Sequence, residues 1–118
     1  MKRSLTLAVA VLALAIAIPV SAATSAKKLQ GTVGPGFTIT LKSGGKKIKS
    51  LKPGKYKITV SDKATNHNFH LKGPGLNKEI TSVSFKGTKS VTVKLKKGKY
   101  TYVCDPHAAF MKGSFTVK

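Results

Sequence analysis

The residues best suited to chemistry lie near the C-terminus, in Y-T-Y-V-C-D-P-H-A-A-F-M-K-G-S-F-T-V, residues 100–117. Cys104, His107 and Met111 offer a thiolate, an imidazole and a thioether within eight residues. Soft metals prefer such ligands, and two His and one Cys with a weak axial Met form a well-known copper site. One histidine is missing from this segment, and His67 is the candidate elsewhere in the chain.

The two ends of this segment have the alternation of β-strands. Tyr100, Tyr102 and Cys104 fall on one face of the first half by two-residue periodicity. Phe115 and Val117 share one face of the second half in the same way. We therefore expect a hairpin in which a short loop carries the cysteine, the histidine and the methionine.

The missing histidine can be sought in N-H-N-F-H-L-K, residues 66–72. His67 shares the alternation of Phe69 and Leu71, whereas His70 belongs to the opposite face. If the two apolar side chains face the core, His67 also faces it and His70 points to water. The pattern therefore predicts a ligand at His67 and a surface residue at His70.

Short alternating segments separated by Gly and Pro turns make up the rest of the domain, without an amphipathic helix of useful length. This organisation predicts an all-β sandwich or barrel. Residues 76–81 read as a loop, or at most one helical turn. We expect strands over residues 28–33, 37–42, 55–60 and 91–96, a short lysine-blunted edge segment over 48–51, and a weak strand around Val83 and Phe85.

The N-terminus has the pattern of a secretory signal peptide. A basic start precedes an apolar run over residues 5–18, and small residues follow it. A retained membrane anchor is the alternative, but the run is too short to span a bilayer comfortably. We expect cleavage near Ala22 to Ala26, which divides the chain into a signal peptide, 1–26, and one domain, 27–118.

The chain is strongly basic, with a net charge of +19 at pH 7 and only three acidic residues. Such charge often serves nucleic-acid binding. Predicted export argues against that function, as does the absence of arginine from residues 27–118, because arginine is preferred for bidentate phosphate contacts. Two interpretations stay open: a solvated lysine-rich surface, and attraction to an acidic partner protein or an anionic cell envelope.

The chain has a single cysteine, Cys104. An exported domain usually pairs its cysteines in disulfides, and this one has no internal partner. A lone thiol outside the cytosol is prone to oxidation unless it is buried or bound to metal. Its position near His107 makes metal binding the better explanation.

These two ligand segments resemble the cupredoxins, the small blue-copper proteins such as plastocyanin, pseudoazurin and amicyanin. The resemblance covers the strand pattern of nearly the whole domain, and it is specific at His67-Asn68, Cys104-Asp105-Pro106-His107 and Met111-Lys112-Gly113. It implies a Greek-key β-sandwich and one type 1 copper ion held by His67, Cys104, His107 and Met111. The spacing from His107 to Met111 is shorter than in plastocyanin and longer than in amicyanin. Of the four ligands, Met111 is therefore the one whose detailed geometry the resemblance specifies least.

The resemblance also implies roles for residues around the ligands. Asn68 matches the residue that ties the two ligand loops together by hydrogen bonding, and its partner would lie near Asp105. In the family, the histidine of the ligand loop reaches the surface inside an apolar patch. Here that patch would consist of Ala108 and Ala109, with Pro35 nearby.

The implied function is an exported type 1 copper protein that shuttles single electrons between redox partners outside the cytoplasm, in the periplasm, the extracellular space or at the cell envelope. We expect a monomer that is not transmembrane after cleavage. Copper handling, as a chaperone or store, is the alternative, although transfer proteins usually have Met- or Cys-rich sites and Met111 is the only methionine after the leader. An enzyme is not expected, because no second histidine cluster exists, and because no orienting Asn or Asp in a suitable context is evident for a cysteine hydrolase built on Cys104 and His107.

Overall fold

The computed structural model describes Ala10, Ala13 and residues 25–118. The predicted signal peptide, 1–26, lies almost entirely outside these described residues and stays a prediction. Within the described part of the chain, no helix has the length and apolar character needed to cross a membrane.

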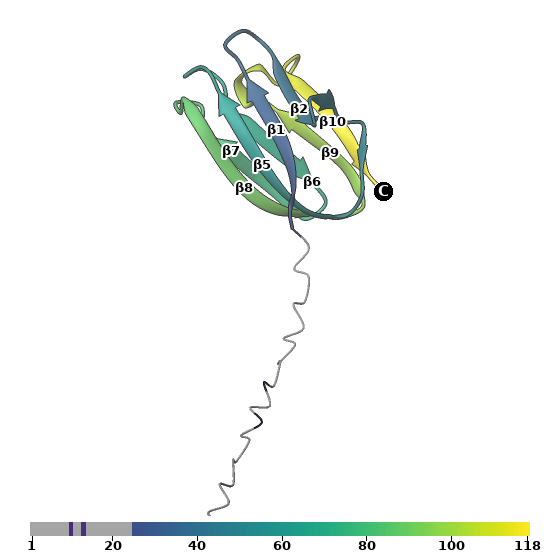
Figure 1. Ribbon diagram of the computed structural model, residues 1–118. Coiled ribbons are helices and arrows are strands. Elements are labelled where there is room, and N and C mark those ends of the chain that lie inside the picture. Colours follow the sequence, from purple (N-terminus) through teal and green to yellow (C-terminus); the bar gives the residue numbers. More distant parts are fainter. Residues whose placement is uncertain (1–9, 11–12, 14–24) are drawn as a thin grey trace, which may run out of the picture.

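Residues 27–117 form two five-stranded sheets that stack as two layers (Figure 1). The first sheet has the order β3 (Lys46–Lys47), β2 (Ile39–Ser43), β1 (Lys27–Val33), β5 (Gly54–Asp62) and β8 (Gly87–Leu95). The second has the order β4 (Ser50–Leu51), β10 (Lys112–Val117), β9 (Gly98–Val103), β6 (Phe69–Gly73) and β7 (Leu76–Thr81). A short 3-10 helix, Asp105–His107, connects β9 to β10.

Both sheets are mixed. β1 runs parallel to β5, and β10 runs parallel to β4, while the other paired strands are antiparallel. The predicted all-β sandwich is therefore confirmed. The arrangement brings the ends of β1, β5 and β9 to the same end of the sandwich as the 3-10 helix.

The core lies between the layers and follows the alternation of the strands. Phe69 of β6 stacks on Tyr102 of β9 with ring centroids 5.8 Å apart, and Tyr100 stacks on Phe115 at 5.4 Å. All four rings are at most 2% exposed. Because truncating a buried aromatic side chain costs about 3–5 kcal/mol, this stack is a major source of stability behind the ligand hairpin.

The short lysine-rich segment lies at sheet edges, as predicted. β3 ends the first sheet and β4 ends the second, and Ile48 between them is buried at 5% exposure. The Ile48 amide donates to the Leu41 carbonyl at 3.2 Å. This hydrogen bond and the burial of Ile48 anchor the segment that crosses from β3 in the first sheet to β4 in the second.

Three local predictions are wrong. Residues 76–81, expected to be a loop or helical turn, form β7, because their backbone pairs with β6 although the segment is rich in polar residues. Val83 and Phe85 precede β8 and are not in a strand. Phe37 was expected within a strand over 37–42, but β2 begins at Ile39 and Phe37 stays in the preceding loop.

Candidate metal centre

Hydrogen bonds close the loop that carries the predicted ligands. The Cys104 amide donates to the Met111 carbonyl at 3.0 Å, which joins the end of β9 to the start of β10. The His107 carbonyl accepts from the Met111 amide at 2.8 Å, and the His107 amide donates to the Cys104 carbonyl at 3.1 Å. The positions of these three residues are thus set by backbone contacts within the loop itself.

His67 reaches the same region from the segment between β5 and β6. Its side chain is fully buried. Gly34, in the loop after β1, has a φ of +70°, and a Cβ there would come within 2.9 Å of Cδ2 of the His67 ring. A glycine is required because this left-handed backbone packs directly against the imidazole.

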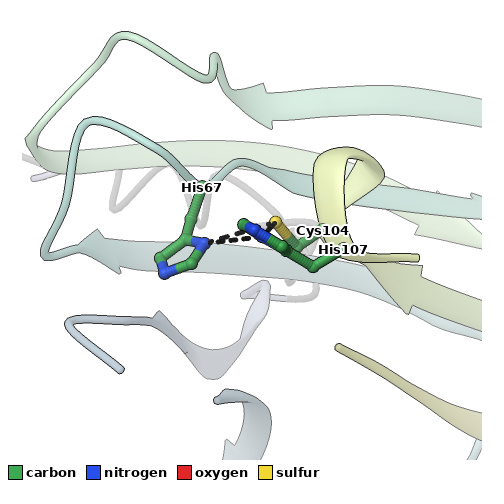
Figure 2. Close-up of side chains that lie close together, drawn as sticks. All are labelled: His67, Cys104 and His107. Atoms are coloured by element: carbon green, nitrogen blue, oxygen red, sulfur yellow. Dashed lines mark hydrogen bonds between the residues drawn. The ribbon is translucent and has the colours of Figure 1, made fainter. Parts of the chain in front are cut away.

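The side chains of His67, Cys104 and His107 converge (Figure 2). The two Nδ1 atoms lie 3.2 Å apart, and each lies 3.6 Å from Sγ of Cys104. Within the described part of the chain, these three residues are the only cluster of His, Cys and acidic side chains that could hold a metal ion.

This triangle fits a metal ion. Bonds of about 2.0 Å to nitrogen and about 2.3 Å to sulfur, arranged trigonally, place the donor atoms about 3.5–3.7 Å apart. The observed separations of 3.2–3.6 Å are close to that spacing. Two imidazoles and one thiol also form the ligand chemistry typical of copper.

Met111 lies at the end of the same loop and is 1% exposed. Its backbone holds Cys104 and His107 through the hydrogen bonds described above. Its backbone is therefore fixed against Cys104 and His107. A role for its sulfur as the axial ligand stays a prediction.

Asn68 links the two ligand segments, as expected. The Asp105 amide donates to Oδ1 of Asn68 at 2.7 Å, and Nδ2 of Asn68 donates to the Asp105 carboxylate at 2.8 Å. The same Nδ2 group donates to Glu79 on β7 at 2.9 Å. Asn68 is fully buried, so these bonds hold the residue beside His67 against the residue beside Cys104.

His70 is not a free surface residue, which corrects the prediction. Its side chain is only 16% exposed, Nδ1 lies 2.7 Å from the Asp105 carboxylate, and Nε2 contacts Asn77. Burial alone would raise the pKa of Asp105, but hydrogen bonds from Asn68 and His70 and the positive charge of Lys72 outweigh it and lower that pKa. Alternation placed His70 on the outer face correctly, but it could not identify these partners.

Sequence and structural comparisons agree on the family. Residues 41–118 match the family of copper binding proteins described as plastocyanin/azurin. The chain is a cupredoxin. Its cofactor is copper, and its fold matches rusticyanin from Thiobacillus ferrooxidans with 26% identity, a TM-score of 0.54, and coverage of 80% of this chain and 79% of rusticyanin.

Other solved structures match to a similar extent. Auracyanin A of Chloroflexus aurantiacus, a blue copper protein, matches with a TM-score of 0.54 and 18% identity over 80% of this chain and 100% of its own. A chain in a haem-copper terminal oxidase dimer matches with a TM-score of 0.52 and 20% identity over 77% of this chain and 63% of that chain. No curated protein matches by sequence.

Two exposed phenylalanines lie over the copper end of this cupredoxin and were missed in the sequence. Phe37 is 61% exposed and Phe110 is 60% exposed, with ring centroids 5.6 Å apart. The His107 ring lies 5.0 Å from Phe37 and 5.7 Å from Phe110. Ala108 and Ala109, the expected patch, are exposed beside them. The apolar surface is therefore larger and more aromatic than predicted.

A buried acid also lies near His67 and was missed. Asp62 at the end of β5 is 2% exposed, and loss of solvation raises the pKa of its carboxyl, an effect partly opposed by Thr81, the Ala64 amide and His67. Its alternation with Tyr56, Ile58 and Val60 could have predicted its inward position. The Ala64 amide donates to Asp62 at 3.3 Å, so this side chain shapes the turn that leads to His67.

Proposed function

We propose that this cupredoxin is a one-electron carrier with a type 1 copper site, rather than an enzyme. His67, Cys104, His107 and Met111 would hold the copper ion, offering it two imidazoles, a thiolate and a thioether. The observation that supports this most directly is the convergence of two imidazole nitrogens and one thiol sulfur within 3.6 Å.

Each ligand has a distinct task in this proposal. Cys104 binds as a thiolate, while both histidines bind as neutral imidazoles through Nδ1. Bound copper would supply a one-electron change between its Cu(II) and Cu(I) states. Asn68 and the closed ligand loop keep the donor atoms in place in both states, so little rearrangement accompanies electron transfer.

Electrons enter and leave beside His107. This ring is half-exposed, whereas His67 and Cys104 are fully buried. Phe37, Phe110 and the small side chain of Ala108 form an apolar surface around it on which a redox partner can dock closely. A short distance between the partner and His107 favours rapid tunnelling.

The partner is an oxidoreductase outside the cytoplasm, reached after export of the processed monomer. Abundant lysine favours an acidic partner, because complementary charge accelerates encounter. The resemblance of the fold to a chain in a haem-copper terminal oxidase is compatible with such a partner.

The test is the second-order rate of electron exchange with an acidic redox protein, measured against ionic strength. Attraction predicts a rate that falls steeply above about 0.1 M salt, where the Debye length is about 10 Å. Ala108→Asp is expected to slow exchange about tenfold without changing the visible spectrum, because it adds charge at the docking surface.

Ser114→Asp is the matched control, since it adds the same charge on the exposed side of β10. It should slow exchange much less than Ala108→Asp. An exchange rate that does not depend on salt concentration and is unchanged by Ala108→Asp would contradict electron entry beside His107.

A further inference from the structure

The outer face of the first sheet has an unusual composition. Strand alternation and pairing register place only lysine, hydroxyl and amide side chains on it, all exposed or half-exposed. We call this surface the lysine–hydroxyl face: Lys28, Gln30, Thr32, Thr40, Lys42, Lys47, Lys55, Lys57, Thr59, Ser61, Thr88, Ser90, Thr92 and Lys94.

The lysines on this face are arranged at a cost to the free protein. Side chains opposite one another on adjacent strands lie about 4.5–5.5 Å apart at Cβ, and like charges there are destabilising. Ordinary surface design would avoid such pairs or offset them with acids. The antiparallel register nevertheless opposes Lys55 to Lys94 and Lys42 to Lys47, and the parallel register of β1 and β5 aligns Lys28 with Lys57.

No acidic side chain offsets this charge. Asp62 is buried, and Asn68 binds both Glu79 and Asp105 at the copper end. Among the described residues, Asp105 takes part in every ion pair. The positive charge of the lysine–hydroxyl face is therefore left for an external anion.

The face also has a place that suits small anionic groups. A shallow depression of about 330 Å³ is lined on this surface by Lys28, Gln30, Lys42 and Thr59, together with residues of the turn after β2. Its lining includes ammonium, amide and hydroxyl donors, together with Leu29. Such a combination suits phosphate oxygens, which accept several hydrogen bonds at once.

We propose that the lysine–hydroxyl face docks this cupredoxin on a membrane rich in anionic phospholipid. The five-stranded sheet spreads its lysines over a broad surface. Such a surface matches a plane of lipid headgroups better than it matches a narrow anionic polymer such as a nucleic acid. The face has no aromatic or arginine side chain for stacking on bases or forking onto a nucleic-acid backbone. It has no apolar side chain to insert, so docking stays at the headgroups.

Docking in this way would leave the copper end uncovered. The lysine–hydroxyl face runs along the side of the sandwich, whereas Phe37, His107 and Phe110 lie at the end where β1, β5 and β9 finish. The protein could then diffuse along the membrane with its apolar patch free. The inference does not depend on electron transfer, since the lipid contacts involve none of the proposed ligands.

The test is co-sedimentation of the protein, as its producing cells process it, with vesicles of one part phosphatidylglycerol to three parts phosphatidylcholine. Pure phosphatidylcholine vesicles report any binding by the apolar N-terminal segment, which contains no lysine of the face. We expect partitioning onto the anionic vesicles alone, weakened as ionic strength rises above about 0.1 M.

Two triple variants with equal loss of charge locate the contact. Changing lysines to glutamine on the face should weaken partitioning about a hundredfold, because each lysine near the surface contributes roughly fivefold. The same change elsewhere should weaken it less than about tenfold. The face variant is Lys28→Gln, Lys57→Gln and Lys94→Gln; the control variant is Lys78→Gln, Lys99→Gln and Lys118→Gln.

Equal losses in the two variants would overturn the proposal, because net charge rather than this face would then be responsible. Failure to bind the anionic vesicles would overturn it as well. Tighter binding to a single-stranded oligonucleotide or an acidic polysaccharide, lost in the face variant, would assign the face to a polymer instead. Thermal melts should show the face variant at least as stable as the parent, since it removes opposed lysines.

Discussion

His67 and His107 bring the same kind of atom to the proposed metal centre from opposite surroundings. His67 is fully buried, with Gly34 packed against its ring and the hydrogen-bonded Asn68 next to it in the chain. His107 is half-exposed, on a loop whose next residues are open to solvent, and the exposed Phe37 packs against its ring.

The difference separates two requirements of an electron carrier. The His67 side resists rearrangement, because the buried Asn68 next to it is held by three hydrogen bonds. The His107 side gives access, because its neighbours are apolar and cost little to desolvate when a partner docks. Substitutions on the two sides should therefore affect different measurements: copper geometry and affinity on one, the rate of exchange on the other.

The largest effect is expected from His67→Ala. It removes one proposed ligand from the buried side, so copper should no longer give a type 1 absorption or electron paramagnetic resonance spectrum. His70→Ala is the matched control, three residues along the chain and outside the proposed ligand set. It should retain both spectra.

Circular dichroism and thermal melts would verify that both alanine variants fold. If His70→Ala lost the type 1 spectrum and His67→Ala kept it, the ligand assignment on this segment would be wrong.

A smaller effect is expected from Asn68→Ala, which leaves all proposed ligands present. Losing the link between His67 and Cys104 should weaken copper binding about 10- to 100-fold, as for other residues that orient metal ligands. Competition with a chelator of known affinity measures this loss.

Asp105→Ala provides the comparison for Asn68→Ala. It removes the carboxylate but keeps the amide that donates to Asn68 at 2.7 Å, so its loss of affinity should be smaller. Asp105→Ala could instead lower copper affinity as much as Asn68→Ala does. The Asp105 carboxylate, which also contacts His70, would then be the main connection between the two ligand segments.

The buried side was the more predictable from sequence. Alternation with Phe69 and Leu71 placed His67 inside, and the structure confirms that placement. The spacing of Cys104 and His107 within a hairpin loop likewise predicted their proximity. Local periodicity indicated His67 only indirectly, because His67 precedes β6 and its neighbour Asn68, of the opposite parity, is equally buried.

The exposed side depends on contacts that periodicity does not encode. Phe37 and Phe110 come from distant loops and meet only because the start of β2 and the ligand loop lie at the same end of the sandwich. β7 was missed for a related reason: its polar sequence is held in a strand by backbone pairing with β6 rather than by its own propensity.

The most direct test of the central claim is the visible absorption spectrum after one equivalent of Cu(II) is added to the parent protein and to Cys104→Ala. The Cys104 thiolate is the only cysteine sulfur available for strong charge transfer to Cu(II), so the parent should turn blue, with an intense band toward the red end of the visible. Cys104→Ala should stay folded and lack that band. A colourless copper adduct of the parent, or an intense band that persists in Cys104→Ala, would contradict a type 1 copper site.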